Sequence, residues 1–137
     1  SDDNEYTLSD FIGKKNVVLV FYPLDFSPVC TKEHACFKED MAKFNNTDAQ
    51  VLGISIDSKW AHKAFAKEMG LDYPLLADFH PKGEVASKYG VYLEAKGITG
   101  RVNIIINKEG KIAAVQENDI PNVPEMEPLH KTLAELS

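Results

Sequence analysis

The stretch between Val17 and Cys30 constrains the fold of this chain more than any other part of it. It begins with an unbroken apolar run over residues 17–22, which is typical of a buried strand. Ser27 and Pro28 then indicate a helix start, because a hydroxyl residue is a favoured N-cap and proline costs nothing at the first helical position. Cys30 falls at about the third helical position, where free N–H groups and the helix dipole favour a thiolate. The pattern predicts a reactive cysteine in a strand–turn–helix unit.

The bulk properties fit one globular domain. A chain of 137 residues with 44% hydrophobic and 26% charged residues is long enough for a substantial core, so we expect a single domain over residues 1–137. A net charge of −6 without a cluster of Lys and Arg argues against a nucleic-acid partner. No apolar run approaches the roughly 20 residues of a membrane-spanning helix, and no signal peptide is evident, so no membrane association is expected.

The two cysteines are too few for the disulfide framework of a small secreted domain. They fit a reducing compartment in which one or both perform chemistry, and the predicted localisation is cytoplasmic.

The remaining pattern alternates helices and strands. We expect helices over residues 28–45, 59–69, 83–89 and 127–136, strands over 16–22, 50–56, 101–106 and 111–115, a short extended piece over 73–76, and a hairpin turn over 107–110. Cys30, Phe37, Met41 and Phe44 share one stripe of the first helix, and the second has an apolar face of Trp60, Ala61, Ala64, Phe65 and Met69. The last helix is expected to bury Leu129, Leu133 and Leu136. This order predicts an α/β fold with a mixed central sheet and helices on both faces.

A free cysteine is most often a buried structural residue, but its place at a helix start favours a reactive one. Pro23-x-x-x-Ser27-x-x-Cys30 resembles the signature of the peroxiredoxin family, Pro-x-x-x-Thr/Ser-x-x-Cys, placed after a strand that ends in aromatic residues. Further landmarks follow in family order: residues 30–33, 54–58, 73–78, 85–91 and 101–110. The spacing is most similar to the one-domain branches, the alkyl hydroperoxide reductase E type and the bacterioferritin-comigratory (Q) type.

This resemblance implies a thioredoxin-like fold and a thiol-dependent peroxidase that reduces hydrogen peroxide, organic hydroperoxides or both, with no metal, haem or flavin. By resemblance, Cys30 is the nucleophile that becomes a sulfenic acid, and Ser27 offers a hydroxyl to the peroxide and the thiolate. Arg101 activates the sulfur and polarises the peroxide, Pro23 shields the sulfur from water, and the N–H groups of Val29 and Cys30 face developing oxygen charge.

Several assignments stay open on the sequence alone. Arg101 is either a surface charge at a strand start or part of the pocket, and Glu33 is either a surface charge in the first helical turn or a pocket residue. Cys36 lies six residues after Cys30, where a continuous helix separates the two by about 9 Å along the axis. A disulfide needs Cα atoms within about 7 Å, so Cys36 can resolve Cys30 only if the helix unwinds. The alternatives are a passive thiol or resolution by an external thiol.

Other residues are expected to be structural. Cys30, His34 and Cys36 diverge around one helix, so a single metal cannot bind all three, and the remaining histidines, His62, His80 and His130, show no partner pattern. Trp60, Phe79 and Tyr89 are predicted to be core or interface residues.

The expected partners are a peroxide and a thiol reductant, either a thioredoxin- or glutaredoxin-like protein or a low-molecular-weight thiol, and a homodimer is expected by resemblance. The family usually has a further segment before the region that matches residues 6–11, so the N-terminal segment is expected to be short or trimmed. Two other functions stay open: a thioredoxin-type thiol–disulfide oxidoreductase, for which the Cys-x-x-Cys pair is missing, and a redox-sensing domain that uses the same sulfenic acid as a signal.

Overall fold

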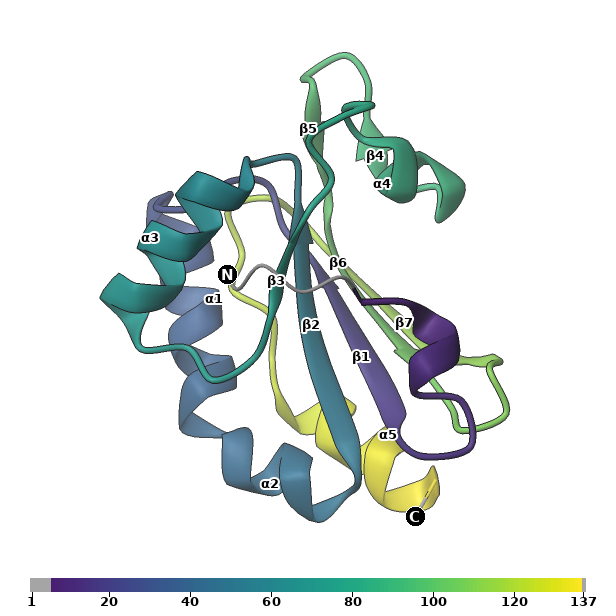
Figure 1. The fold of residues 1–137 in the computed structure, drawn as a ribbon. Helices are drawn as coiled ribbons and strands as arrows, with labels where there is room; N and C mark the ends of the chain where they lie inside the picture. Colours follow the sequence, from purple (N-terminus) through teal and green to yellow (C-terminus); the bar gives the residue numbers. More distant parts are fainter. Residues whose placement is uncertain (1–5, 137) are drawn as a thin grey trace.

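The computed structural model describes residues 6–136, and a five-stranded sheet with the strand order β3-β2-β1-β6-β7 forms its centre (Figure 1). The predicted domain extends to residues 1–5 and 137, which lie outside the described residues. The strands of this sheet are β1 (Asn16–Phe21), β2 (Ala49–Ser55), β3 (Leu75–Ala77), β6 (Arg101–Ile106) and β7 (Ile112–Asn118). A separate two-stranded sheet is formed by β4 (Tyr92–Leu93) and β5 (Ile98–Thr99).

The helices connect the strands in the expected order. They are the 3-10 helix η1 (Leu8–Asp10) and the α-helices α1 (Pro28–Glu39), α2 (Met41–Asn46), α3 (Lys59–Met69), α4 (Glu84–Lys88) and α5 (Glu127–Leu136). None of these described helices combines the length and the apolar character that crossing a bilayer requires.

The sheet is mixed, as predicted. β1 runs parallel to β2, with Val18 opposite Val51, and antiparallel to β6, with Leu19 opposite Ile104. Because β1 and β6 run in opposite directions, the end of β1 and the start of β6 lie at the same edge of the sheet. The turn that follows β1 and the arginine that opens β6 are therefore neighbours in space, although about 70 residues separate them in the chain.

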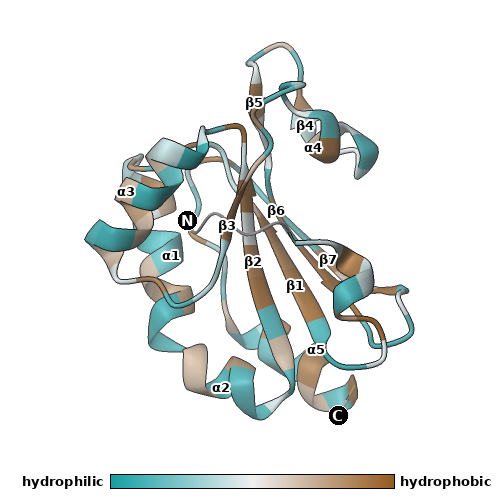
Figure 2. Cartoon of the chain, in the orientation of Figure 1, coloured by the Kyte–Doolittle hydropathy of each residue, from teal (hydrophilic) through white to brown (hydrophobic). Residues whose placement is uncertain are grey.

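Helices cover both faces of the sheet, which confirms the predicted layers. Alternating residues of β1 point to opposite faces: Val18 and Val20 pack with α1, α2, α3 and α5, whereas Val17 and Leu19 pack on the side of η1 and α4. β1 and β6 are buried along their whole length and are mostly hydrophobic (Figure 2), because helices cover both faces of the sheet. The fold is thioredoxin-like, in agreement with the sequence expectation.

The helix predicted over residues 28–45 is in fact two helices, which corrects the sequence interpretation. Asp40 leaves the helical conformation, with φ −92° and ψ 9°, and caps both the end of α1 and the start of α2. Its carboxylate lies 2.8 Å from Nε2 of His130 in α5, a contact between distant segments that local helical periodicity does not reveal. Phe37 and Phe44 still face the core, with their rings stacked 5.5 Å apart.

The predicted apolar face of α3 is confirmed for Phe65 and Met69 and is wrong for Trp60 and Ala64. Trp60 is 68% exposed and Ala64 is exposed, whereas His62 and Phe65 are buried and Ala66 and Met69 pack against the core. The buried stripe therefore follows positions 62, 65, 66 and 69, and it includes a histidine that the sequence interpretation counted as polar. Two smaller differences are that β7 extends to Asn118 and that Leu136 is only partly buried. The short β4–β5 pair was not predicted.

Candidate active site

Cys30 occupies the third position of α1, as predicted, and its side chain is fully buried. Pro28 takes the first helical position after the N-cap Ser27, whose backbone is extended. The first helical hydrogen bond runs from the N–H of Thr31 to the carbonyl of Ser27 at 2.9 Å. The N–H groups of Val29 and Cys30 precede that bond, so they have no carbonyl partner within the helix. The sulfur thus lies at the positive end of the α1 dipole.

Arg101 reaches the same point from the start of β6. Its Nη1 donates to Sγ of Cys30 at 3.3 Å and to Oε1 of Glu33 at 2.7 Å, and its Nε donates to the carbonyl of Ile120 at 2.8 Å. The guanidinium is buried and is therefore fixed by its partners rather than by solvent. The structure thus places the predicted cation against the predicted nucleophile.

Glu33 is the pocket residue that the sequence left undecided. Its carboxylate is fully buried, it pairs with Arg101 through Oε1, and its Oε2 has no hydrogen-bond partner among the described residues. Burial raises the pKa of Glu33 from its ordinary value to about 7, although the neighbouring Arg101 acts in the opposite direction. This carboxyl group therefore keeps its proton to a higher pH than an ordinary glutamate does.

The turn between β1 and α1 leads into the helix that carries Cys30. Pro23 is buried, and the hydroxyl of Ser27 donates to the carbonyl of Leu24 at 3.0 Å. Ser27 is the N-cap by position, but its side chain makes no capping hydrogen bond, which corrects the predicted hydroxyl cap. Among the described residues, no hydrogen bond joins this hydroxyl to the Cys30 sulfur, so its predicted role toward a peroxide stays a prediction. Phe26 adopts a positive φ of 66°, which is rare for a residue other than glycine.

Cys36 does not approach Cys30 as a disulfide partner in this conformation. Both cysteines are free thiols, and α1 is continuous from Pro28 to Glu39, so the helical separation expected from the sequence applies. Cys36 is partly buried, and this burial raises the pKa of its thiol, with the Glu39 and Asp40 carboxylates adding to the effect.

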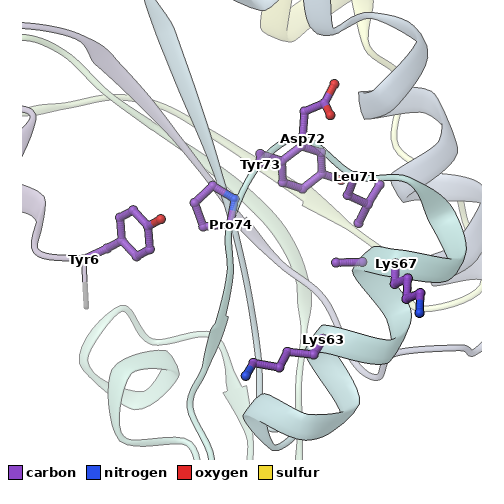
Figure 3. Close-up of a pocket in the computed structure, with 8 residues that line it drawn as sticks. Tyr6, Lys63, Lys67, Leu71, Asp72, Tyr73 and Pro74 are labelled. Carbon is purple, nitrogen blue, oxygen red and sulfur yellow. The ribbon is translucent and has the colours of Figure 1, made fainter. Parts of the chain in front are cut away.

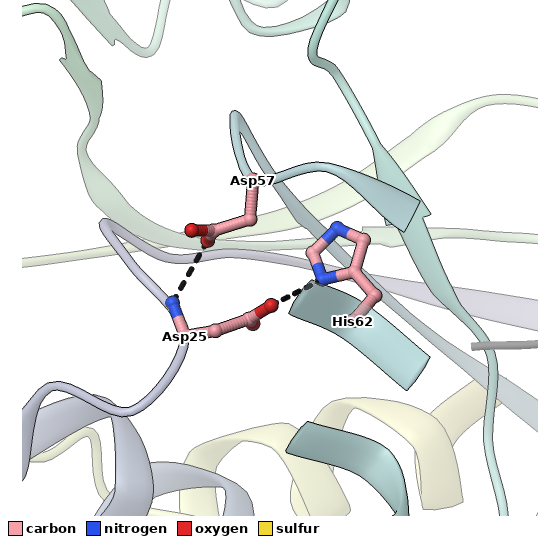
Figure 4. Close-up of side chains that lie close together, drawn as sticks. All are labelled: Asp25, Asp57 and His62. Atoms are coloured by element: carbon pink, nitrogen blue, oxygen red, sulfur yellow. Dashed lines mark hydrogen bonds and ion pairs between the residues drawn. The ribbon is translucent and has the colours of Figure 1, made fainter. Parts of the chain in front are cut away.

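A second buried group of polar side chains supports the turn. Asp25, Asp57 and His62 place one ligand atom each within 4.8 Å of one another (Figure 4), so by residue type they are the set that could hold a metal ion. Their atoms are already joined by hydrogen bonds: Nδ1 of His62 lies 2.7 Å from Oδ2 of Asp25, and the N–H of Asp25 donates to Asp57 at 2.8 Å. These hydrogen bonds fix Asp25, Asp57 and His62 relative to one another. Sequence analysis missed it, although His62 shares a helical stripe with Phe65 and Ala66.

His34 lies on the buried face of α1, and its Nδ1 is hydrogen-bonded to the hydroxyl of Tyr73. Burial lowers the pKa of His34 to about 3, and the nearby His62 and Arg101 add to the effect, so this imidazole is neutral at physiological pH. It confirms the structural role expected for this histidine.

A surface groove runs along α3 and residues 71–74, where Lys63 and Lys67 stand near Tyr73 and Pro74 (Figure 3). Neither Cys30 nor Arg101 lines it. The chemistry of the site therefore lies at the end of β1 and the start of β6, and not in this groove.

Comparison with known proteins agrees with this geometry. The family model described as the AhpC/TSA family matches residues 1–115. Alkyl hydroperoxide reductase E of Mycobacterium tuberculosis is 39% identical over 106 residues, which cover 77% of this chain and 69% of that protein. Peroxiredoxin-2 of Bos taurus is 43% identical over 124 residues, which cover 85% of this chain and 61% of that protein. The crystal structure of Enterococcus faecalis AhpC superimposes with a TM-score of 0.85 at 35% identity, covering 93% of this chain and 77% of that one.

A buried cysteine at a helix start, an arginine against its sulfur and a thioredoxin-like sheet define a thiol-dependent peroxidase of the peroxiredoxin class. The chain belongs to the AhpC/TSA family. The resemblance to the alkyl hydroperoxide reductase E type is confirmed, and the comparisons give no support to a thioredoxin-type oxidoreductase or a dedicated sensor.

Proposed function

We propose that Cys30 is the residue that reacts with the peroxide. In the proposed step the thiolate sulfur attacks one peroxide oxygen, so that an S–O bond forms as the O–O bond breaks. The sulfur loses two electrons and becomes a sulfenic acid, while the other oxygen leaves as hydroxide or alkoxide and takes up the proton that the thiol released on ionising, which gives water or an alcohol. The single observation that carries this assignment is the 3.3 Å contact between Arg101 Nη1 and Cys30 Sγ.

Arg101 is proposed to act on both reactants. Its permanent positive charge lies against the reacting sulfur, and its N–H groups are donors that can stabilise charge on the peroxide oxygens as the O–O bond lengthens. Glu33 orients the guanidinium through a 2.7 Å ion pair. The N–H groups of Val29 and Cys30, Pro23 and the hydroxyl of Ser27 complete the proposed pocket. Because Cys30 is fully covered, a peroxide needs a small displacement of the turn to reach it.

The sulfenic acid is proposed to be resolved by an external thiol rather than by Cys36. Attack by a thiol R–SH on the sulfenic acid forms a mixed disulfide and releases water, and a second thiol then restores Cys30 and leaves as a disulfide. The unbroken helix between the two cysteines and the raised pKa of Cys36 support this route, since a protonated thiol is a poor nucleophile. The reductant is proposed to be a thioredoxin- or glutaredoxin-like protein or a low-molecular-weight thiol.

We also propose a homodimer and a reducing compartment such as the cytoplasm. Trp60 and Phe79 are 68% and 57% exposed and line one shallow surface depression with Ala77, which gives a second copy an apolar surface to cover. Both cysteines are free, which suits a reducing environment.

The test of the proposed function is the rate at which the reduced protein consumes hydrogen peroxide and a small organic hydroperoxide. Cys30→Ser is expected to abolish the reaction, and Cys36→Ser, the matched control, is expected to leave the rate of the first step unchanged. Full activity of the Cys30→Ser protein would exclude Cys30 as the nucleophile.

A further inference from the structure

A buried network fixes the middle of the turn that leads from β1 to Cys30. Asp25 receives the hydroxyl of Tyr22 on Oδ1 and faces Nδ1 of His62 with Oδ2, at 2.7 Å. Its own N–H donates to Oδ2 of Asp57 at 2.8 Å, and that oxygen also accepts the hydroxyl of Ser55. Figure 4 shows the two carboxylates and the imidazole converging on this point. Asp25 is therefore held from three sides.

Both ring nitrogens of His62 have a partner in this network. Nε2 of His62 lies 3.0 Å from the carbonyl of Leu76 in β3, and Nδ1 faces the Asp25 carboxylate. His62 is fully buried, and it links α3, β3 and the turn in one rigid contact. The same contact leaves neither nitrogen free to bind a metal ion.

The backbone of the turn is strained directly beside this network. Phe26, the residue next to Asp25, has a φ of 66°. A left-handed conformation of a bulky residue is unfavourable, and it persists only where its surroundings fix it. Ser27, the next residue, is the N-cap of α1 and therefore sets the position of Cys30. A turn that relaxed at Phe26 would move Ser27 and the start of α1.

We propose that His62 and Asp25 are positioning residues of the peroxidase: they hold the strained turn in the one conformation that aligns Pro23, Ser27 and the N–H groups around the Cys30 sulfur. This inference rests on the proposed role of Cys30. Neither side chain contacts the sulfur, so their effect on the reaction is indirect and runs through the backbone of residues 23–27. A misalignment of that backbone lowers the rate because the reacting atoms are no longer held in line.

The first experiment compares rates of peroxide consumption in protein shown by circular dichroism and urea unfolding to be folded. His62→Gln is expected to lower the second-order rate constant by about tenfold or more. Tyr22→Phe removes one hydroxyl from the network without changing its shape and is expected to lower the rate to a smaller extent. His130→Gln is the matched control: it breaks the other Asp–His contact, with Asp40 at the opposite end of α1, and should cost stability without changing the rate.

The second experiment separates positioning from general stability. Phe26→Gly and Phe26→Ala are each added to His62→Gln. Both remove the contact between the Phe26 and Phe65 rings, whose centroids are 5.1 Å apart, but only glycine adopts a positive φ without cost. Glycine is expected to restore a measurable part of the lost rate, and alanine is not.

The outcomes are distinct for the two proposals. A wild-type protein that consumes no peroxide contradicts the proposed function itself. If the wild type is active, the inference is contradicted when both His62→Gln and Tyr22→Phe react within about twofold of the wild-type rate, or when Phe26→Gly and Phe26→Ala behave alike in the His62→Gln background.

Discussion

At the scale of single residues, Arg101 is the position on which the candidate site depends most. It is the single arginine of the sequence, and its buried guanidinium contacts Cys30, Glu33 and the carbonyl of Ile120 at once. Three directed contacts from one planar group exploit the fork geometry of arginine, which lysine cannot reproduce. The charge and the shape of this residue both matter.

Arg101→Lys is therefore expected to lower the rate of peroxide consumption by about 100-fold, because the positive charge remains but the donors aimed at the sulfur and the peroxide are lost. Stopped-flow or competition kinetics measure this rate. Lys88→Gln, which changes an exposed cation in α4, is the control and should have no effect. A lysine variant with the wild-type rate would show that charge alone is enough.

The adjacent residues Glu33 and His34 have opposite effects on the free energy of unfolding as the pH changes. The pKa of Glu33 is raised to about 7, so its folded form holds a proton that the unfolded chain releases, and its contribution to stability is lost as the pH rises from about 4.5 through 7. The pKa of His34 is lowered to about 3, so the unfolded chain binds the extra proton, and its contribution is lost as the pH falls below about 6.5.

Between pH 7 and pH 5 these two effects are each about 2 kcal/mol and nearly cancel. The wild-type free energy of unfolding is therefore expected to change little over this range. Glu33→Gln removes the compensating group, so this variant is expected to lose about 2 kcal/mol of stability between pH 7 and pH 5. Urea unfolding at several pH values measures the free energy of unfolding of the wild type and of Glu33→Gln. If this free energy changes with pH in the same way in both proteins, the raised pKa of Glu33 is contradicted.

At the scale of secondary structure, the continuity of α1 determines whether Cys36 can reach Cys30. The helix is continuous from Pro28 to Glu39, and the break that sequence periodicity did not predict comes at Asp40, after Cys36. His34 and Phe37 anchor the helix between and beyond the two cysteines. The part of the chain that would have to unwind for an internal disulfide is therefore the buried part.

Mass spectrometry after one equivalent of peroxide is expected to show the gain of one oxygen atom at Cys30. A loss of two hydrogen atoms, with Cys30 joined to Cys36 in the same peptide map, would instead show that α1 unwinds in each cycle. Tyr73→Phe removes the hydrogen bond to His34 and is the variant most expected to increase any disulfide fraction.

At the scale of the whole molecule, two exposed aromatic side chains support the proposed homodimer. Trp60 is the second residue of α3 and Phe79 follows β3, and both lie outside the core, so of the two roles expected for them only an interface role remains. An exposed tryptophan next to an exposed phenylalanine is unusual on a free surface and typical of an interface centre.

Trp60→Glu is accordingly expected to shift the protein from dimer to monomer in sedimentation-velocity measurements, because a buried carboxylate opposes association. Trp60→Phe, which keeps an apolar ring, is the control and should retain the dimer. Identical sedimentation of wild type and Trp60→Glu would place the interface elsewhere or exclude it.

The sequence alone determined the order of the elements, the bounds of α3 and β6, and the position of Cys30 in the first turn of α1. These features depend on local patterns: apolar runs, an N-cap followed by proline, and a glycine in the left-handed conformation at the end of α3. Arg101 could be associated with Cys30 only through the family resemblance, because nothing in the sequence near Arg101 indicates its partner.

The tertiary structure alone decided the contacts between distant segments. It placed Glu33 in the pocket, broke the first helix at Asp40, buried His62 in place of Trp60, and joined Asp25 to His62 across 37 positions of the chain. In each case a charged or polar side chain is buried because a partner far away in the sequence compensates its charge or its hydrogen bonds. Local periodicity carries no record of such a partner, so only the packed fold reveals it.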